Sequence, residues 1–529
     1  MTVWRRRDLA TLLLLAPDAA EALLRAPPRA GRHAEIAARI DTSEDLLQTE
    51  PSASPSLAFS VSLLSSIRDV AQAEWDEIAS RNESPFSEWG WLHSLEASGC
   101  ACAETGWTPY HMVVRHDDSS RLVAAVPMYL KSHSLGEFAA DAPWVDLAQQ
   151  RGVQYYPKLL CAVPFTPVEG SRVLLSPELS AAVRAQLLLL VAKYLRTLAQ
   201  QNGLASVHAN FCTDEEVAAF SQAGFLQQQS MQYHWWNAAS AASGGAAIGG
   251  AGKGSGEVAA LHVAAEPADT GPTGGDGGDG SRGAAAWPAS RTPYRHFDDY
   301  LSSFRSKRRM QIRRERAAVA KSGVATRVLT GEQVRPEMMA LIFHLYKRTV
   351  ERNVWGQQYL NERFFTMLVQ WYRERLCIVL ALQGDEVVGA TLNVLKDGVL
   401  YGRYWGSLHG GEERYPFLHF ETCYYAPLEH AIEQGWQRFE PGAGTPDSRL
   451  TRGFQPVRTH SVHLFCDVGL HREVAERLQS QRQRQQSDAE QQNSPAAQEQ
   501  RTVLCGSEVF EHRVMLKGSG RPAHLRQAP

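Results

Sequence analysis

The distribution of apolar and polar positions predicts two separate antiparallel sheet segments. In the earlier segment, two runs of β-branched and other apolar side chains flank a polar turn at residues 117–120, which predicts a hairpin over residues 111–115 and 122–130. In the later segment, three such runs are separated by two short polar turns that each contain glycine. They predict a three-stranded meander over residues 377–382, 387–395 and 399–406.

The segments that follow the two sheets repeat one order. Each sheet is followed by a helical stretch, a short strand, a Gly-Phe pair and a closing β-rich run. These are residues 180–201, 204–211, 224–225 and 231–236 in the first half, and 417–434, 436–440, 453–454 and 459–465 in the second. The repetition predicts an α/β protein made by tandem duplication, in which each half has a mixed, mainly antiparallel sheet flanked by helices.

A chain of 529 residues is longer than one hydrophobic core usually serves, so two domains with tails are expected. Residues 238–290 are almost all small or polar and cannot offset the entropy lost on ordering, which predicts a flexible Gly/Ala-rich insert. The predicted order is a disordered segment or presequence, a first domain, this insert, a second domain, and a Gln-rich helix with a tail, at residues 1–56, 57–237, 238–290, 291–470 and 471–529.

The formal net charge of −3 gives no general attraction to nucleic acid or anionic membranes, so such a partner needs a local basic patch. The eight cysteines lack zinc-site spacing, and we expect reduced thiols and no metal. No run approaches the roughly 20 apolar residues of a membrane-spanning helix. Arg5, Arg6 and Arg7 precede a short apolar run that could begin a presequence. We expect a soluble protein of the cytoplasm or of an organelle, a plastid or a mitochondrion.

Several literal strings closely resemble one protein family. In the first half they are residues 126–138 (VPMYLKSHSLGEF), 155–159 (YYPKL) and 163–168 (VPFTPV). In the second half they are residues 401–406 (YGRYWG), 418–425 (LHFETCYY), 439–443 (FEPGA) and 452–454 (RGF). Together they resemble the Fem-like family of predicted N-acyltransferases described as peptidoglycan biosynthesis/recognition, within the superfamily of GNAT (general control N-acetyltransferase) proteins.

The resemblance spans about residues 85–465 apart from the insert, and it implies tandem GNAT-like (acyl-CoA N-acyltransferase) domains. It also implies transfer of an acyl or aminoacyl group from a CoA or tRNA carrier to a small-molecule or peptide amine. The chain departs from the family at Pro427, whose missing N–H predicts a helix kink, and at residues 444–449, where the family has a His- and Lys-containing run. The alternative is a non-catalytic module that binds a glycan, peptide or RNA between the halves.

The predicted helix that carries Glu421 supplies the candidate catalytic residues. A helix that begins beside the end of a split sheet is where a GNAT-like fold holds its acyl donor, and its free N–H groups favour anions. We expect Glu421 to act as general base or to position the amine, with His419 and Tyr425 beside it. The alternative is that Glu421 pairs with a buried arginine such as Arg403. Expected substrate-binding residues at the end of the meander are Arg403, Tyr404 and Trp405.

A basic helix is predicted at residues 305–321, and it bears on the identity of the donor. The loop at 408–416 lacks the standard pyrophosphate-binding spacing and contains Glu412 and Glu413, which disfavours CoA and favours aminoacyl-tRNA. The expected phosphate-binding residues, in contact with tRNA or CoA, are Lys307, Arg308, Arg309, Arg313 and Arg314. The alternative is an ordinary solvated face.

The first half has a candidate acceptor pocket of its own. It consists of polar and aromatic residues around two of the family strings, namely His133, Glu137, Asp141, Trp144, Tyr155, Tyr156 and Lys158. In a duplicated acyltransferase one half can keep the chemistry while the other shapes the acceptor site. For Lys158, a surface ion pair is the alternative role.

Overall fold

The computed structural model describes residues 38–40, 57–237, 292–352, 356–408, 414–442 and 446–493. Contacts divide the chain into one unit with residues 1–245 and 278–471 and another with 246–277 and 472–529. Both predicted halves therefore lie in the first unit. The insert at 238–290, the tail beyond 493, and residues 1–56 apart from 38–40 lie outside the described part.

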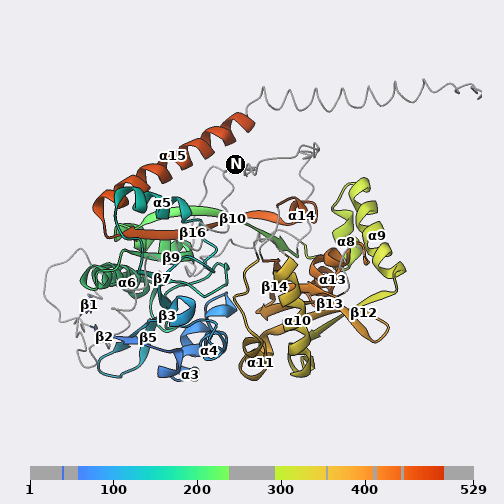
Figure 1. Ribbon diagram of the computed structural model, residues 1–529, viewed down its shortest axis with the longest axis horizontal. Coiled ribbons are helices and arrows are strands. Elements are labelled where there is room, and N and C mark those ends of the chain that lie inside the picture. Colours follow the sequence, from blue (N-terminus) through green and yellow to red (C-terminus); the bar gives the residue numbers. More distant parts are fainter. Residues whose placement is uncertain are drawn as a thin grey trace, which may run out of the picture. The chain divides into compact units, whose positions relative to one another are not determined.

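The helices and strands follow the predicted order (Figure 1). Those of the first half are β1 (Ala38–Ile40), β2 (Leu57–Leu64), α3 (Gln72–Ala79), α4 (Trp89–Ala97), β3 (Trp107–Pro109), β4 (His111–His116), β5 (Leu122–Val126), β6 (Met128–Lys131), α5 (Ala142–Arg151), β7 (Lys158–Cys161), β8 (Leu174–Leu175), α6 (Ala181–Gln201), β9 (Ser206–Cys212), α7 (Asp214–Gln222) and β10 (Leu226–Trp236).

The second half begins after the insert. Its elements are α8 (Phe297–Ser302), α9 (Ser306–Lys321), β11 (Val324–Thr330), α10 (Glu337–Arg352), α11 (Glu362–Trp371), β12 (Leu376–Gln383), β13 (Glu386–Lys396), β14 (Val399–Ser407), α12 (Leu418–Phe420), the π-helix η7 (Glu421–Tyr425), α13 (Ala426–Glu433), β15 (Arg438–Glu440), α14 (Pro446–Leu450) and β16 (Gln455–Phe465), and α15 (Val468–Asn493) follows. Helix α9 confirms the predicted basic helix.

Local chemistry explains the predicted strands and helices. The hairpin is β4 with β5, and Pro127, which has no N–H to donate, separates β5 from β6. The meander is β12, β13 and β14, paired antiparallel throughout. Helix α6 begins after Ser180, whose hydroxyl accepts a hydrogen bond from the Val183 N–H and so satisfies one free donor of the first turn.

The two halves exchange their last strands. Strand β10 of the first half lies between β15 and β16, and β16 of the second half lies between β10 and β9, in a sheet with the order β11-β12-β13-β14-β15-β10-β16-β9-β7-β6-β3. Strands β10 and β16 are paired antiparallel from Leu226–His463 to His234–Gln455 (Figure 1). The sequence predicted both closing strands, but it placed each in the sheet of its own half.

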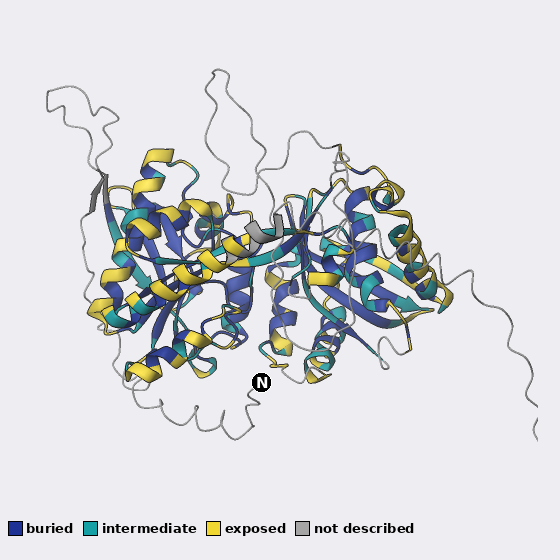
Figure 2. Ribbon diagram, turned by 90° about the horizontal axis from the view of Figure 1, so that it is seen from above, coloured by how far each residue is buried: buried dark blue, intermediate teal, exposed yellow. Residues whose placement is uncertain are grey.

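The buried side chains show that the exchange is part of the packing. Val462 and Leu464 of β16 belong to the core of the first half, whereas Tyr233 and Trp235 of β10 belong to the core around α13 in the second half. Figure 2 shows the buried strands between helices whose outer faces are exposed. Each half therefore buries apolar surface supplied by the other.

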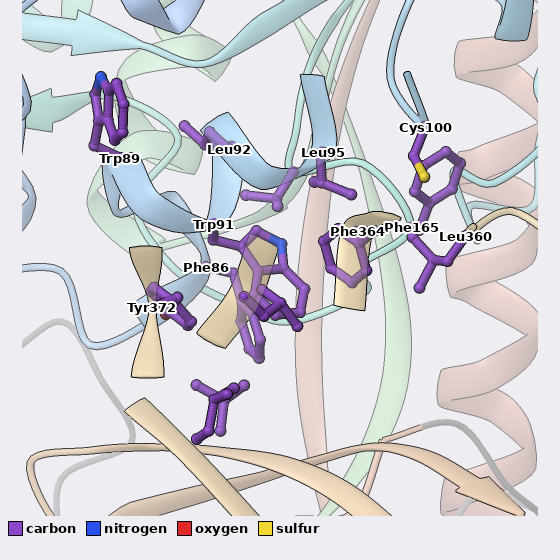
Figure 3. Close-up of a cluster of buried hydrophobic side chains, with 14 of the residues drawn as sticks. Phe86, Trp89, Trp91, Leu92, Leu95, Cys100, Phe165, Leu360, Phe364 and Tyr372 are labelled. Carbon is purple, nitrogen blue, oxygen red and sulfur yellow. The ribbon is translucent and has the colours of Figure 1, made fainter. Parts of the chain in front are cut away.

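A third core joins the halves directly. Aromatic residues of α4 and the segment before it pack against α11, with Trp91 edge-on to Phe364 at 5.3 Å and to Tyr372 at 5.6 Å between ring centres (Figure 3). Phe165, from the segment after β7, and Leu360, just before α11, belong to the same cluster. This cluster thus contains buried residues of both halves.

The helix of the second half changes its hydrogen-bond pattern next to Pro427. The Ala426 N–H donates to the carbonyl of Glu421, five residues back, which is the π-type bond of η7. Because Pro427 has no N–H, a wider turn before it accommodates the ring without a clash. Tyr424, Leu428 and Ala431 of this helical segment are buried, whereas Phe417, just before it, is 39% exposed.

Candidate functional site

A buried lysine connects the polar residues that the sequence singles out in the first half. Lys158 is fully buried, and its ammonium lies 2.9 Å from Glu137 Oε2, 2.7 Å from Asp141 Oδ2 and 2.8 Å from Ser134 Oγ. The Tyr156 hydroxyl lies 2.8 Å from Ser134 Oγ. Lys158 therefore forms an ion pair, as one alternative held, but the pair lies in the interior and not on the surface.

Burial and neighbouring charges give the groups of this cluster different protonation states. Against the effect of burial, the carboxylates of Glu137 and Asp141 raise the pKa of Lys158, so its ammonium stays charged. Burial lowers the pKa of Lys131 to about 6 and that of His133 to about 4. The cluster therefore combines a charged ammonium with a neutral amine and a neutral imidazole near pH 7.

The cluster lies beneath a loop that reaches the second half. Leu135 and Phe138 are 40% and 52% exposed, and between them Gly136 has a φ of +80°. A Cβ at Gly136 would lie 2.6 Å from the Phe165 ring, so only glycine fits there. Tyr359 of the second half stacks on Phe165 at 5.0 Å. The loop that carries Ser134 and Glu137 therefore packs against residues of both halves.

Trp144 packs against a buried histidine pair. Its ring lies 4.6 Å from the His463 ring, and His463 Nδ1 lies 2.8 Å from His208 Nδ1. Burial lowers the pKa of His463 to about 3 and moves the pKa of His208 well below its ordinary value. The sequence did not single out either histidine, because they lie on β9 and β16, which meet only through the strand exchange.

Glu421 is engaged by an arginine of the basic helix. Both of its carboxylate oxygens accept from Arg316 Nε, at 3.2 and 3.1 Å, and one accepts from Arg316 Nη2 at 3.0 Å. Arg316 also reaches Glu429 at 2.6 Å. Burial raises the pKa of Glu421 while Arg316 opposes that shift. Arg403 was the example given of a buried arginine that could pair with Glu421. The arginine that pairs with Glu421 is Arg316.

Tyr425 belongs to a second network on the same helix. Its hydroxyl donates to Glu315, whose Oε2 also lies 3.0 Å from the Arg452 guanidinium. The Arg452 guanidinium in turn lies 3.5 Å from the centre of the Phe420 ring. Glu421 and Tyr425, one helical turn apart, thus contact the adjacent residues Arg316 and Glu315 of α9.

His419 lies among aromatic rings. Its ring is 5.5 Å from Trp405 and 5.8 Å from Tyr424. Burial lowers the pKa of His419 to about 4, so the imidazole is neutral at pH 7 and can accept a proton or a hydrogen bond. The structure therefore brings His419 and Trp405 together, and places the contacts of Glu421 and Tyr425 on helix α9.

Arg403 and Tyr404 point to the junction of the halves. Arg403 Nη2 donates to the Phe165 carbonyl at 2.7 Å, and its guanidinium lies 5.2 Å from the centre of the Phe86 ring. Tyr404 packs edge-on against Tyr346 at 5.3 Å. The register between β13 and β14 shifts at this point, and the bulge turns neighbouring side chains to different faces.

Some basic side chains of helix α9 form hydrogen bonds within the protein, and others are exposed. It buries Ile312, Glu315 and Val319. The half-buried Arg308 and Arg309 donate to the carbonyls of Thr451 at 2.6 Å and Phe304 at 2.8 Å. The remaining predicted phosphate-binding residues, Lys307, Arg313 and Arg314, are exposed, and Arg313 pairs with the exposed Asp298 at 2.9 Å.

Each half contains a parallel pair of strands whose pairing ends before the chain turns away. In the first half β7 and β9 are paired up to Cys161 and Ala209, and the chain then leaves β7. Residues 162–173 cap the end of β9, because the Gly170 N–H and the Arg172 guanidinium donate to the Phe211 carbonyl at 3.1 and 3.2 Å.

In the second half β14 and β15 are paired up to Tyr401 and Glu440. Strand β14 then continues directly to Ser407, paired with β13. The backbones stay close just past this point, since a Cβ at Gly402 would lie 3.0 Å from the Pro441 carbonyl oxygen. Each half thus has a parallel strand pair that ends, and in the first half residues 162–173 cap that end.

Three further features concern the described residues: metal sites, membrane-spanning helices and cavities. Within the described ranges, no group of three or more His, Cys, Asp or Glu side chains is arranged to hold a metal ion. The same part of the chain has no helix long and apolar enough to cross a membrane. A cavity of about 180 Å³ lies between α6 and strands β2 and β4, away from the groups above, and is lined mainly by apolar side chains such as Leu187 and Met112.

Comparisons with known proteins agree with this architecture. Solved structures similar to the chain include FemX (11% identity, TM-score 0.42, covering 77% of this chain and 98% of that one). They also include the C-terminal domain of a protein described as a lysylphosphatidylglycerol synthetase from Agrobacterium fabrum (7%, 0.41, 77% and 95%). A third is a tandem GNAT protein from the clavulanic acid biosynthesis pathway (13%, 0.34, 77% and 98%). At these identities and TM-scores, the likenesses say nothing about substrates.

The sequence itself identifies the family. A comparison with curated proteins gave no significant match. The sequence profile of the FemAB-like family, described as peptidoglycan biosynthesis/recognition, matches residues 66–243 and 281–499, which together are well over half of the chain. The chain therefore belongs to the FemAB-like family.

Proposed function

We propose that this protein transfers an acyl or aminoacyl group from a phosphate-bearing carrier to an amine, and that its second half holds the donor. The observation that carries the proposal is the difference between the two strand partings. Beyond Tyr401 and Glu440, β14 continues along β13 and the described residues place no strand between it and the chain that follows β15, whereas residues 162–173 cap the strand end in the first half. A GNAT-like fold holds its acyl donor at such a parting.

The basic helix supports a carrier with phosphates. Lys307, Arg313 and Arg314 are exposed on α9, and α9 is tied to the helix after β14 by the pair of Arg316 with Glu421. Cations held on a rigid helix can neutralise phosphates of tRNA or CoA, and binding then weakens as salt increases. Pairing with α9 makes Glu421 and Tyr425 supports of this arrangement, and it leaves the neutral imidazole of His419 as the helix residue available to a substrate.

The polar cluster of the first half supports an acceptor on the other side of the junction. Glu137 Oε1 is buried and has no hydrogen-bond partner among the described residues. A buried carboxylate oxygen without a donor is costly, and an ammonium or N–H group of a ligand would satisfy it. We therefore assign acceptor binding to Glu137, Lys158 and Tyr156 beneath the loop of Leu135 and Phe138.

The test is a donor-binding and transfer assay with the full chain. Acetyl-CoA, a longer acyl-CoA, and charged and uncharged tRNA are compared by thermal shift at two salt concentrations, and labelled donors are then tested with a mixture of amines. Stabilisation by one carrier class identifies the donor. Trp405→Ala, which removes a ring beside His419, should weaken donor binding about tenfold. Trp371→Ala, a partly exposed tryptophan on α11, is the matched control.

A second candidate is recognition without chemistry. The full engagement of Glu421 and Tyr425 by α9 favours it, because these helix carboxylate and phenol groups already have partners. A protein that binds a peptide, glycan or RNA tightly, but transfers nothing from any donor tested, would have this role. Absence of both binding and transfer with every carrier would contradict the donor assignment.

A further inference from the structure

Glu440 is a buried carboxylate at the point where β14 and β15 part. It is the last residue of β15 and is 5% exposed. Its Oε1 lies 3.0 Å from the Arg438 guanidinium. Its Oε2 has no hydrogen-bond partner among the described residues, and the His234 Nε2 lies 3.6 Å away from it. One oxygen of this buried group is therefore available to a further donor.

A second carboxylate comes from the first half. Glu169 lies in the segment 162–173, and it is half-buried. No hydrogen bond or ion pair engages its side chain within the described part of the chain. Burial, followed by the charge of Glu440, raises the pKa of Glu169 to about 8. The segment is held near Glu440, because Gln232 Nε2 donates to the Pro167 carbonyl at 2.8 Å and Gln232 Oε1 lies 3.3 Å from His234 Nε2, the neighbour of Glu440. Two acids from different halves thus lie near one another, and Glu169 is the more exposed of the two.

Burial and the surrounding charges hold the pKa values of both carboxyl groups near neutral pH. Burial raises the pKa of Glu440 to about 7, with Arg438 opposing, Glu83 adding to the rise and Arg403 opposing it. Arg438 is shared with Glu83 at 2.9 Å. His234 is neutral, because burial moves its pKa well below the ordinary value. Three carboxylates therefore face two arginines, and a cation added to the pair would be favoured.

We propose that Glu440 and Glu169 form the subsite that receives the ammonium group of the acceptor and takes its proton. This inference rests on the proposed function, because it places the acceptor nitrogen at the parting assigned to the donor. It also goes beyond that function, since neither glutamate is among the acceptor residues assigned above. Glu169 contacts the ammonium from the partly exposed side, and Glu440 accepts the proton at Oε2.

The chemistry balances with these groups alone. The ammonium loses one proton to Glu440, which later passes it to water. The neutral amine nitrogen then forms a bond to the carbonyl carbon of the donor, and the bond from that carbon to the carrier sulfur or oxygen breaks. The second proton leaves the nitrogen for the departing thiolate or alkoxide. A base that titrates near neutral pH suits the first step.

The experiment measures binding and transfer separately on the full chain. Cadaverine, a simple diamine, is titrated by calorimetry into wild type, Glu440→Gln, Glu169→Gln and the control Glu178→Gln, an exposed glutamate in an ion pair with Arg121. Glu440→Gln and Glu169→Gln should each bind cadaverine about tenfold more weakly than wild type and the control. Thermal unfolding shows that each variant is folded. Equal binding by all four proteins, or no millimolar binding by wild type, overturns the subsite.

The transfer arm separates this subsite from the proposed function. With the donor that stabilises the protein, the rate at saturating acceptor should rise with pH through about 7 in wild type and lose that step in Glu440→Gln. A Glu440→Gln enzyme with the wild-type rate and pH profile overturns the subsite while transfer stands. Diamine binding that depends on Glu440, without transfer from any donor, instead supports the subsite and refutes the transfer function.

Discussion

In the first half, β7 and β9 end their pairing where residues 162–173 cap the end of β9, whereas in the second half β14 runs on past the end of β15, paired with β13. The same contrast holds for charge. The first half encloses an ammonium between two carboxylates, and the second pairs its helix carboxylate with an arginine that is partly exposed. The first half thus encloses its cation completely, and the second half leaves its cation partly exposed.

The largest expected effect comes from removing the enclosed ammonium. In Lys158→Met, Glu137 and Asp141 would remain buried without their counter-ion, and we expect a loss of about 3 to 5 kcal/mol in the free energy of unfolding. Arg316→Met should cost less, about 1 to 3 kcal/mol, because the Arg316 side chain is 25% exposed and that of Lys158 is 1% exposed. Urea unfolding measures both. Equal losses would show that the enclosed Lys158 network does not contribute more to stability than the partly exposed Arg316 network.

The next prediction concerns residues 162–173, which cap the end of β9 in the first half. Arg172 is 2% exposed and donates to the carbonyls of Val168, Gly170 and Phe211. Arg172→Met leaves the carbonyls of Val168 and Gly170 without this donor, while the Phe211 carbonyl keeps the Gly170 N–H, and we expect a loss of about 2 to 3 kcal/mol. Arg403→Met, which frees one carbonyl, should cost about 1 kcal/mol. Chemical denaturation compares them, and an unchanged stability of Arg172→Met would mean that Arg172 does not hold the segment in place.

A smaller effect is expected in the pH dependence of stability. The pKa of Lys131 falls from 10.5 to about 6 on folding because of burial. Between these values the unfolded chain binds a proton that the folded protein does not, so this group makes stability rise with pH across that window. Lys131→Met should reduce the slope of stability between pH 7 and 9 by up to about 1.4 kcal/mol per unit. The exposed Lys193→Met is the control, and an unaltered slope in Lys131→Met contradicts the assignment.

The smallest effect on stability is expected at the basic helix. Replacing Lys307, Arg313 and Arg314 together by Gln should change the free energy of unfolding by no more than about 0.5 kcal/mol, since all three are exposed. If the helix binds tRNA, the slope of log affinity against log salt should fall by about 2. Gln substitutions at the exposed Arg68, Arg81 and Lys193 of the first half should leave that slope unchanged. Matching slopes in both triple variants would remove α9 from the donor site.

The sequence predicted those features that depend on neighbouring residues. The hairpin, the meander and the helix α6 follow from local alternation, turns and caps, and the order of elements revealed the duplication. The clustering of Glu137, Tyr156 and Lys158 was also predictable, because they belong to strings that resemble a known family, and Asp141 follows the first of these strings by three residues.

The sequence could not supply what depends on long-range pairing. Arg316 and Glu421 are 105 residues apart, and no local pattern links them. The pairing of β10 with β16 depends on which sheet edges are free, and both strands fit either edge by alternation alone. The position of Glu440 beside Glu169 follows from the same assembly, so its chemistry could not be read from the string that contains it.

The exchange of β10 and β16 also determines how the protein can be made. Because each half's sheet is completed by a strand encoded in the other, either half synthesised alone would present an unpaired edge and lack part of its core. During translation the first half waits for β16 before its sheet is complete, which makes late, long-range pairing a required folding step. A gene divided within residues 245–290 should therefore yield two fragments that fold only in each other's presence.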